Sequence, residues 1–236
     1  MPSVFLTAEW RNLLMVNYVV EPTTLAPYLP AGTELDFWRG ETYVSIVGFQ
    51  FLRTRLSGVP VPFHRNFEQL NLRFYVRRRT PEGWRKGVVF IKEIVPKWAV
   101  AFVARTVYRE HYVRMPMRSR IEIPGPISYE WCYGGDWDSV SGTAVGSPYL
   151  PDADAEATYI TEHYWGYARQ RDGSTFEYEV RHPHWPVRQC ESPVLSCRVP
   201  ELYSERFTEF LSVPPRSAFV VDGSAVSVHR GNRLVG

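Results

Sequence analysis

The stretch GVVFIKEIVPKWAVAFVARTVYREHY, residues Gly87–Tyr112, changes character partway along, and we interpret the rest of the chain as built around it. It begins as an apolar β-strand, and Pro96 then suits the first turn of a helix. Valines at helical spacing predict that this helix runs from about Lys97 to Arg109. The stretch ends in arginine, tyrosine, acid and histidine side chains. We expect this polar end to form a wall of a ligand cavity.

The segment before this stretch, Gln69–Arg77, shows the clearest alternation in the chain. Apolar residues from Leu70 to Val76 share one face, while Asn71, Arg73 and the residues at the next alternate positions share the other. Similar short runs recur along the chain, so at least nine short strands and two to four short helices are predicted. Closure is the direct way to hide the edges of so many strands. The predicted fold is mainly β, with an antiparallel, closed or nearly closed cone- or barrel-like sheet around an interior cavity.

Three glycine-containing segments predict local features of this sheet. Gly48, inside an apolar strand, indicates a bulge or a close backbone approach. Asp172-Gly173 lies between two alternating runs and predicts a hairpin turn. The range 134–146 is rich in glycine, serine and aspartate and is predicted to be a mobile loop. With no linker or repeat in evidence, residues 1–236 are expected to form a single domain.

Composition excludes several classes of partner. The net charge is only +2, which is too small to favour nucleic acid or an anionic membrane surface. The three cysteines form no even-numbered framework and no CxxC pair. No apolar run approaches the ~18 residues of a membrane span. We therefore expect a soluble cytoplasmic protein that does not bind membranes or nucleic acid. Self-association into a homo-oligomer is left open.

Several segments together resemble a known family. They are Asn17-Tyr18, LPAG at 29–32, VSIVGFQF from Val44, FEQLNLRFYVR from Phe67, GVVF from Gly87, YITEHYWGYAR from Tyr159 and HPHWPV from His182. In order and spacing they are similar to the YqjF-like family of uncharacterised bacterial proteins, which is placed near the acetoacetate decarboxylases. The resemblance spans nearly the whole chain. It implies a cone-like or barrel-like β fold with an interior cavity.

The resemblance does not extend to the decarboxylase chemistry. Those enzymes use a lysine of depressed pKa to form a Schiff base with the keto acid. The corresponding region here, Arg105–Arg118, contains no lysine, and neither Lys92 nor Lys97 lies in a matching motif. Schiff-base decarboxylation is therefore not expected, and no cofactor is implied.

Arginines and tyrosines are the candidate ligand-binding residues. An arginine fork binds carboxylate or phosphate with two parallel hydrogen bonds, so an anionic small molecule is the expected ligand. The candidates are Arg73, Arg105, Tyr108, Tyr112, Arg118 and Tyr164. The alternatives are that Arg73 faces solvent, that Arg105 pairs with a structural acid, and that the tyrosines satisfy local backbone groups.

Acids and histidines supply the candidate catalytic and metal sites. Glu162 and His163 could act as general acid or base beside an arginine, or could belong to a structural ion pair. His182 and His184 flank one proline, so in an extended chain both rings point to the same side. With His163 or His111 they would make a metal site. The alternative is a packing motif, in which Trp185 covers one end of the barrel and a histidine hydrogen-bonds to the backbone. A pair of histidines without a spaced third ligand is a weak signal, so no metal is predicted.

Three functions remain open from the sequence. The first is a cavity protein that binds a small anionic metabolite, such as a carboxylate. The second is a lyase- or isomerase-type enzyme with Glu162 or His163 as acid or base and Arg105 as the carboxylate clamp. The third is a structural module whose cavity is filled by its own side chains. A void between the Asn71/Arg73 strand and the polar end of Gly87–Tyr112 would favour the first two.

Overall fold

The computed structural model describes residues 3–60, 62, 64–96 and 112–234. In these ranges, 15 strands join in one sheet. They are β1 (Val4–Val20), β2 (Glu34–Leu35), β3 (Thr42–Leu56), β4 (Val59–Pro60), β5 (Phe67–Thr80), β6 (Gly83–Val95), β7 (Tyr112–Arg114), β8 (Met117–Ile121), β9 (Gly125–Tyr133), β10 (Asp136–Tyr149), β11 (Trp165–Arg169), β12 (Thr175–Arg181), β13 (Val187–Ser196), β14 (Ser217–His229) and β15 (Asn232–Leu234). The helix predicted from Lys97 to Arg109 lies outside the described residues.

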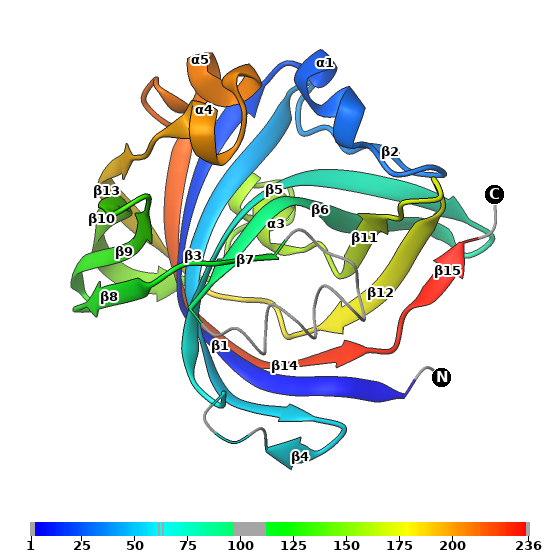
Figure 1. Cartoon of the computed structure of the whole chain (residues 1–236), viewed down its shortest axis with the longest axis horizontal. Helices are drawn as coiled ribbons and strands as arrows, with labels where there is room; N and C mark the ends of the chain where they lie inside the picture. The colour runs from blue at the N-terminus through cyan, green and yellow to red at the C-terminus, as the bar shows by residue number, and fades with distance from the viewer. Residues whose placement is uncertain (1–2, 61, 63, 97–111, 235–236) are drawn as a thin grey trace.

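Seven of these strands close into a ring (Figure 1). Their order is β12–β11–β6–β5–β3–β1–β14, and the pairs Val180–Val228 and Arg181–Ser227 join β12 back to β14. Neighbours in the ring are antiparallel except for β6 and β11, and β7 also pairs with β6 in parallel. The predicted mainly β fold with a closed sheet is confirmed, with these two parallel pairings as an addition. Closure gives each of the seven ring strands a paired neighbour on both sides, through two residue pairs each at the β6–β11 and β12–β14 contacts.

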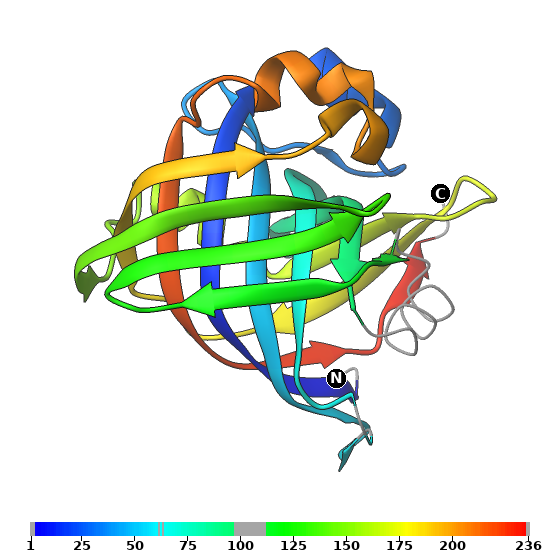
Figure 2. The same cartoon turned by 60° about the vertical axis from the view of Figure 1, so that its left-hand side comes forward.

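The rest of the sheet folds back over the outside of the ring. From β14 it continues through β13, β10, β9 and β8, and these strands cross over β1 and β3 (Figure 2). Tyr129 and Trp131 of β9 are fully buried in the layer between the two parts of the sheet. A methyl group at Gly48 would come within 2.5 Å of the Tyr129 ring, so glycine is required for this approach. The close backbone approach expected at Gly48 is therefore present.

The ring has apolar residues on both of its faces. Leu14 and Val16 of β1 point outward into the layer under β9, whereas Leu13 and Met15 point into the ring. β3 alternates in the same way. Burial on both sides explains why these strands read as nearly continuous apolar runs.

Among the residues described, three short helices gather at the top of Figure 1 and pack into the apolar layer outside the ring, whereas a fourth, which carries Tyr159 and Ile160, packs against the residues that point into the ring. The helices in the described ranges are α1 (Pro22–Leu25), α3 (Glu156–Thr161), α4 (Val199–Leu202) and α5 (Thr208–Leu211), with 3₁₀ turns at Ala26–Tyr28 and Glu205–Phe207. Tyr28 and Phe207 come from the two 3₁₀ turns, and their ring centres lie 5.7 Å apart. This contact joins the segment of α1 to the segment of α4 and α5. Of the helices described, none is long and apolar enough to cross a membrane.

The mobile loop predicted over 134–146 is wrong. Gly134 and Gly135 have positive φ angles of 60° and 98° and make a tight turn, after which the chain runs as the 14-residue strand β10. One face of β10 buries Val140 and Ala144, while its serines and threonine lie on a more exposed face. Polar residues are compatible with a strand in an outer layer because one of its faces is solvated.

Candidate functional site

A cavity of about 160 Å³ lies inside the seven-strand ring. Most of its lining is aromatic or aliphatic, with contributions from every strand of the ring. The polar lining residues are Thr54, His64, Gln69, Asn71, Arg73, Glu93, Thr161, His163 and His182. An apolar cavity with a small number of polar groups is the usual form of a small-molecule site.

Strand β5 builds the polar wall of this cavity. Its alternation places Leu70, Leu72 and the other apolar residues outward, into the layer under β9. The polar positions Gln69, Asn71 and Arg73 consequently face into the ring. The pattern resembles that of a half-solvated strand, but here the polar face points at an interior cavity and not at bulk water.

Arg73 is held on two sides. Its Nη2 donates a hydrogen bond of 3.2 Å to the carbonyl of Ile160, and its guanidinium lies 5.5 Å from the ring centre of Tyr75. Its buried Nε has no hydrogen-bond partner among the residues described. A guanidinium fixed in this way, with a donor still available, is suited to a carboxylate or phosphate oxygen.

Two amides and a carboxylate line the same cavity as Arg73. Gln69 Nε2 donates to Glu93 Oε1 at 2.8 Å, and Asn71 pairs with Glu93 in the β5–β6 register. The side chains of Gln69, Asn71 and Glu93 are each at least 97% buried. Within the described ranges, Gln69 Oε1 and Asn71 Oδ1 have no hydrogen-bond partner. Buried polar atoms of this kind normally have partners, so a bound molecule or water is the natural source of one.

His163 forms a buried pair with Asp36. Its Nε2 lies 3.2 Å from Asp36 Oδ2, which also lies 3.4 Å from Lys86 Nζ. Burial lowers the pKa of His163, while the hydrogen bond to Asp36 opposes this. For Asp36, burial alone would raise the pKa, but His163 and Lys86 together hold it below its ordinary value. The pair therefore consists of a neutral imidazole and a carboxylate.

The arrangement around His163 fixes its tautomer. Because Asp36 can only accept, Nε2 carries the hydrogen and Nδ1 has a lone pair. In the described part of the chain, Nδ1 has no hydrogen-bond partner. The ring packs against both Tyr75 and Tyr159, at centroid distances of 4.8 and 5.2 Å, and His163 lines the cavity. A carboxylate-oriented neutral imidazole can accept a proton from a ligand.

Glu162 and Tyr164 lie beside the cavity and not in its lining. The Tyr164 hydroxyl donates to Glu162 Oε2, and His184 Nε2 lies 3.3 Å from the same oxygen. Glu162 is thus engaged by its immediate neighbours, which agrees with the structural alternative for this residue. His163 is the better placed of the two predicted acid–base residues.

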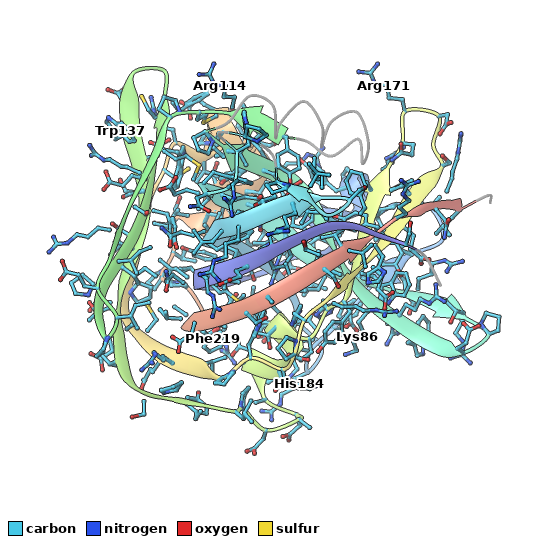
Figure 3. The ribbon with its side chains drawn as sticks, turned by 90° about the horizontal axis from the view of Figure 1, so that it is seen from below. Lys86, Arg114, Trp137, Arg171, His184 and Phe219 are labelled. Carbon is cyan, nitrogen blue, oxygen red and sulfur yellow. The ribbon has the colours of Figure 1, made fainter. Side chains whose placement is uncertain are left out.

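The two histidines of the HPH motif differ in burial and in their partners. His182 lines the cavity and stacks on Trp185, with ring centres 3.8 Å apart and planes 12° from parallel. His184 is 74% exposed at its side chain and lies at the periphery of the molecule (Figure 3). The expectation that both rings share one side does not hold, because His182 packs on Trp185 in the cavity wall while His184 is exposed and pairs with Glu162. In the described ranges no three His, Cys, Asp or Glu side chains are grouped for a metal ion.

Arg118 is not a cavity residue, and its prediction as one is wrong. It belongs to β8 in the outer layer, where it contacts Glu130 with hydrogen bonds of 2.8 and 2.6 Å and lies 4.2 Å from the Trp137 ring centre. Figure 3 places Trp137 on that outer layer. Tyr112, by contrast, lines the cavity. Arg105 and Tyr108 lie outside the described residues.

Two of the three lysines are described, and neither lines the cavity. Lys92 follows a shift in the β5–β6 register and donates to the carbonyl of Leu202 in α4, on the outside of the ring. Lys86 contacts Asp36 from a half-exposed position. Lys97 lies outside the described residues.

Stability should fall on acidification because of the buried histidines. Burial lowers the pKa of His163 and of His182, so both bind protons more readily in the unfolded chain. Their contribution is present above about pH 6.5 and is lost as pH falls below it, with a limit of about 1.4 kcal/mol per pH unit for each proton. Urea unfolding at pH 7.5, 6.5 and 5.5 measures this slope. Replacing His163 or His182 with glutamine should reduce it, and the double variant should reduce it most. An unchanged slope in all three variants would contradict the assignment.

Asp36, Gln69 and Glu93 are site residues that the sequence did not single out. Gln69 was detectable, since it shares the alternating face of Asn71 and Arg73. Glu93 follows an irregular step in β6, so its orientation could not be read from periodicity. Asp36 is 127 residues from His163, and no local pattern indicates that pairing.

The fold is that of the acetoacetate decarboxylases. The structure superposes on acetoacetate decarboxylase from Legionella pneumophila with a TM-score of 0.70 at 13% identity, covering 99% of this chain and 88% of the other. The enduracididine biosynthesis enzyme MppR, in its complex with pyruvate, gives a TM-score of 0.71 at 14% identity, covering 100% and 91%. At these identities the likeness concerns the fold alone.

The family follows from the sequence itself. The model of the family DUF2071, described as an uncharacterized conserved protein, matches residues 7–225, so the chain belongs to that family. Protein YqjF of Bacillus subtilis (strain 168) is 25% identical over 189 residues, which is 78% of this chain and 76% of that protein. The predicted resemblance to the YqjF-like proteins is confirmed.

Proposed function

We propose that this protein binds a small organic carboxylate inside the ring. The observation that carries the proposal is Arg73, which is fixed on the inner face of β5 and has a buried Nε without a partner among the residues described. The amide of Asn71 lines the same cavity and offers a further donor, and the Tyr112 side chain also contributes to the lining. The pyruvate bound by MppR supports a carboxylate ligand for this fold.

The volume of the cavity inside the ring favours a bound ligand over a core filled by the protein's own side chains. A cavity of about 160 Å³ lined mainly by apolar groups is larger than the voids of an ordinary close-packed interior. Unpartnered polar atoms in its wall would be costly without a ligand or water. Both features support binding over a purely structural module.

Acids compared with their own amides test this proposal. A panel of acetate, pyruvate, benzoate and phenylacetate is added to the whole protein, and the melting temperature is compared with that in the matching amides. An acid at about 100 times its Kd stabilises the folded state by about 2.7 kcal/mol, or roughly 5–10 °C for a chain of this size. Amides should give smaller shifts because they lack the charge. Equal shifts for every acid and its amide would overturn the proposal.

A second candidate is an enzyme that moves a proton at the carbon next to a carbonyl. It is favoured by the neutral His163, whose Nε2 is held by Asp36 and whose Nδ1 has no partner among the residues described. Arg73 would hold the substrate carboxylate in place of the predicted Arg105, which lies outside the described residues. The same panel followed by proton NMR in D₂O would reveal exchange or turnover. His163→Gln should abolish either one while leaving binding.

A further inference from the structure

The cavity has walls of opposite character. β5 provides the polar wall with Asn71 and Arg73. In the ring, β12 and β14 are each three strands away from β5, so they face it across the interior. The lining residues of that opposite side are Tyr178, Val180 and Val228, which are all at least 91% buried. A ligand that satisfies both walls needs a charged end and an apolar body.

Aromatic rings complete the apolar side. Trp10 of β1 meets Phe49 edge to face at a centroid distance of 5.3 Å and Phe51 at 5.7 Å. Its ring centre is also 6.3 Å from that of Trp185, on which His182 stacks. All of these side chains line the cavity. Such a wall presents both ring edges and ring faces, which are the surfaces against which another aromatic ring packs well.

The volume sets the size of the apolar body. An apolar protein cavity of ~150 Å³ holds one benzene molecule. The cavity here, at about 160 Å³, therefore has space for one six-membered ring with a short polar substituent. A two-carbon or three-carbon acid would leave the apolar wall uncovered, and a fused ring system would exceed the space.

We propose that the ligand is a monocyclic aromatic carboxylate, with its carboxylate at Arg73 and its ring against Trp10, Val180 and Val228. This inference rests on the proposed function, since it names the class of carboxylate that the same cavity takes. The carboxylate lies on the β5 side because Arg73 and Asn71 are there, and the ring extends toward the β12–β14 pair. The cavity volume of about 160 Å³, and not a specific hydrogen bond, selects against larger acids.

Direct titration separates this inference from the proposed function. Phenylacetate, pyruvate and phenylacetamide are titrated into the whole protein by isothermal calorimetry. We expect phenylacetate to have at least a tenfold lower Kd than either of the others. If pyruvate binds as tightly as phenylacetate or more tightly, the aromatic class is wrong and carboxylate binding stands. If phenylacetamide binds as tightly as phenylacetate, the carboxylate requirement itself fails.

A variant that fills the cavity gives an independent check. Val180→Phe adds a ring where the ligand ring is placed, so it should raise the Kd for phenylacetate at least tenfold and change that for pyruvate less than threefold. Val194→Phe is the matched control, because Val194 lies on β13 with 53% exposure. An unchanged phenylacetate Kd in a folded Val180→Phe protein would overturn the placement. If that variant does not fold, the ligand series on the unaltered protein still decides.

Discussion

Replacing Asp36 with alanine is expected to lower the free energy of unfolding by about 3 kcal/mol. The carboxylate is 97% buried at its side chain and is the partner of His163 Nε2 at 3.2 Å and of Lys86 Nζ at 3.4 Å. Its removal leaves a fully buried imidazole N–H without an acceptor. Lys86 is half exposed and can return to water, which keeps the expected loss near the lower end of the range for a broken buried pair. Urea unfolding at pH 7.5 measures the change.

Glu34 provides the matched control for Asp36. It lies two residues earlier and pairs with Arg77 at 2.7 Å, but its side chain is 52% exposed. Exposed ion pairs contribute about 0–1 kcal/mol, so Glu34→Ala should change stability by less than that. Asp36→Asn keeps an acceptor for His163 and should lose less than Asp36→Ala. A loss in Asp36→Ala no larger than in Glu34→Ala would show that the buried pair does not stabilise the fold.

The alternation of β5 shows how far the sequence predicts the site. Period-two alternation places Asn71 and Arg73 on one face of a strand, and this holds in the structure. The pattern does not say whether a polar face meets water or an interior cavity. That outcome depends on ring closure through the Val180–Val228 pair, which joins strands that are far apart in the sequence.

Local patterns failed where the polarity of a segment had two explanations. Residues 134–146 were predicted to be a loop because they are polar, yet an outer-layer strand tolerates the same residues. Arg118 was predicted to lie in the cavity because an arginine fork suits an anionic ligand, but β8 lies in the outer layer and Glu130 faces Arg118 there. Strand pairings between distant parts of the chain decide where β10 and Arg118 lie. Such pairings cannot be inferred from sequence periodicity.

The pairing of Asp36 with His163 explains why His163, and not Glu162, is the better candidate for an acid or base. Glu162 and His163 are adjacent in the sequence, and the sequence alone gives no reason to prefer either as the acid or base. In the structure the end of α3 turns His163 into the cavity, while Glu162 meets Tyr164 and His184. The chemical role of His163 then depends on an acid from a distant segment that fixes its tautomer.

Replacing Arg73 with glutamine is expected to raise the Kd of phenylacetate about 100-fold. A hydrogen bond to a charged group contributes about 1.5–3 kcal/mol, and each 1.4 kcal/mol corresponds to a tenfold change in Kd. Arg73 is the described cavity-lining residue with a permanent positive charge, so its removal should eliminate most of the preference for an acid over its amide. Calorimetric titration of the acid and the amide into Arg73→Gln measures both effects.

Arg118→Gln is the control for the loss of an arginine as such. Arg118 pairs with Glu130 in the outer layer, so its removal should leave the Kd of phenylacetate within about twofold of the original. Arg73 also supports the fold through Ile160, and Arg73→Lys separates that role from charge, because lysine keeps the charge without the fork. We expect Arg73→Lys to bind the acid more weakly than the original protein and more tightly than Arg73→Gln. If a folded Arg73→Gln protein binds phenylacetate within threefold of the original, the ligand carboxylate does not lie at Arg73.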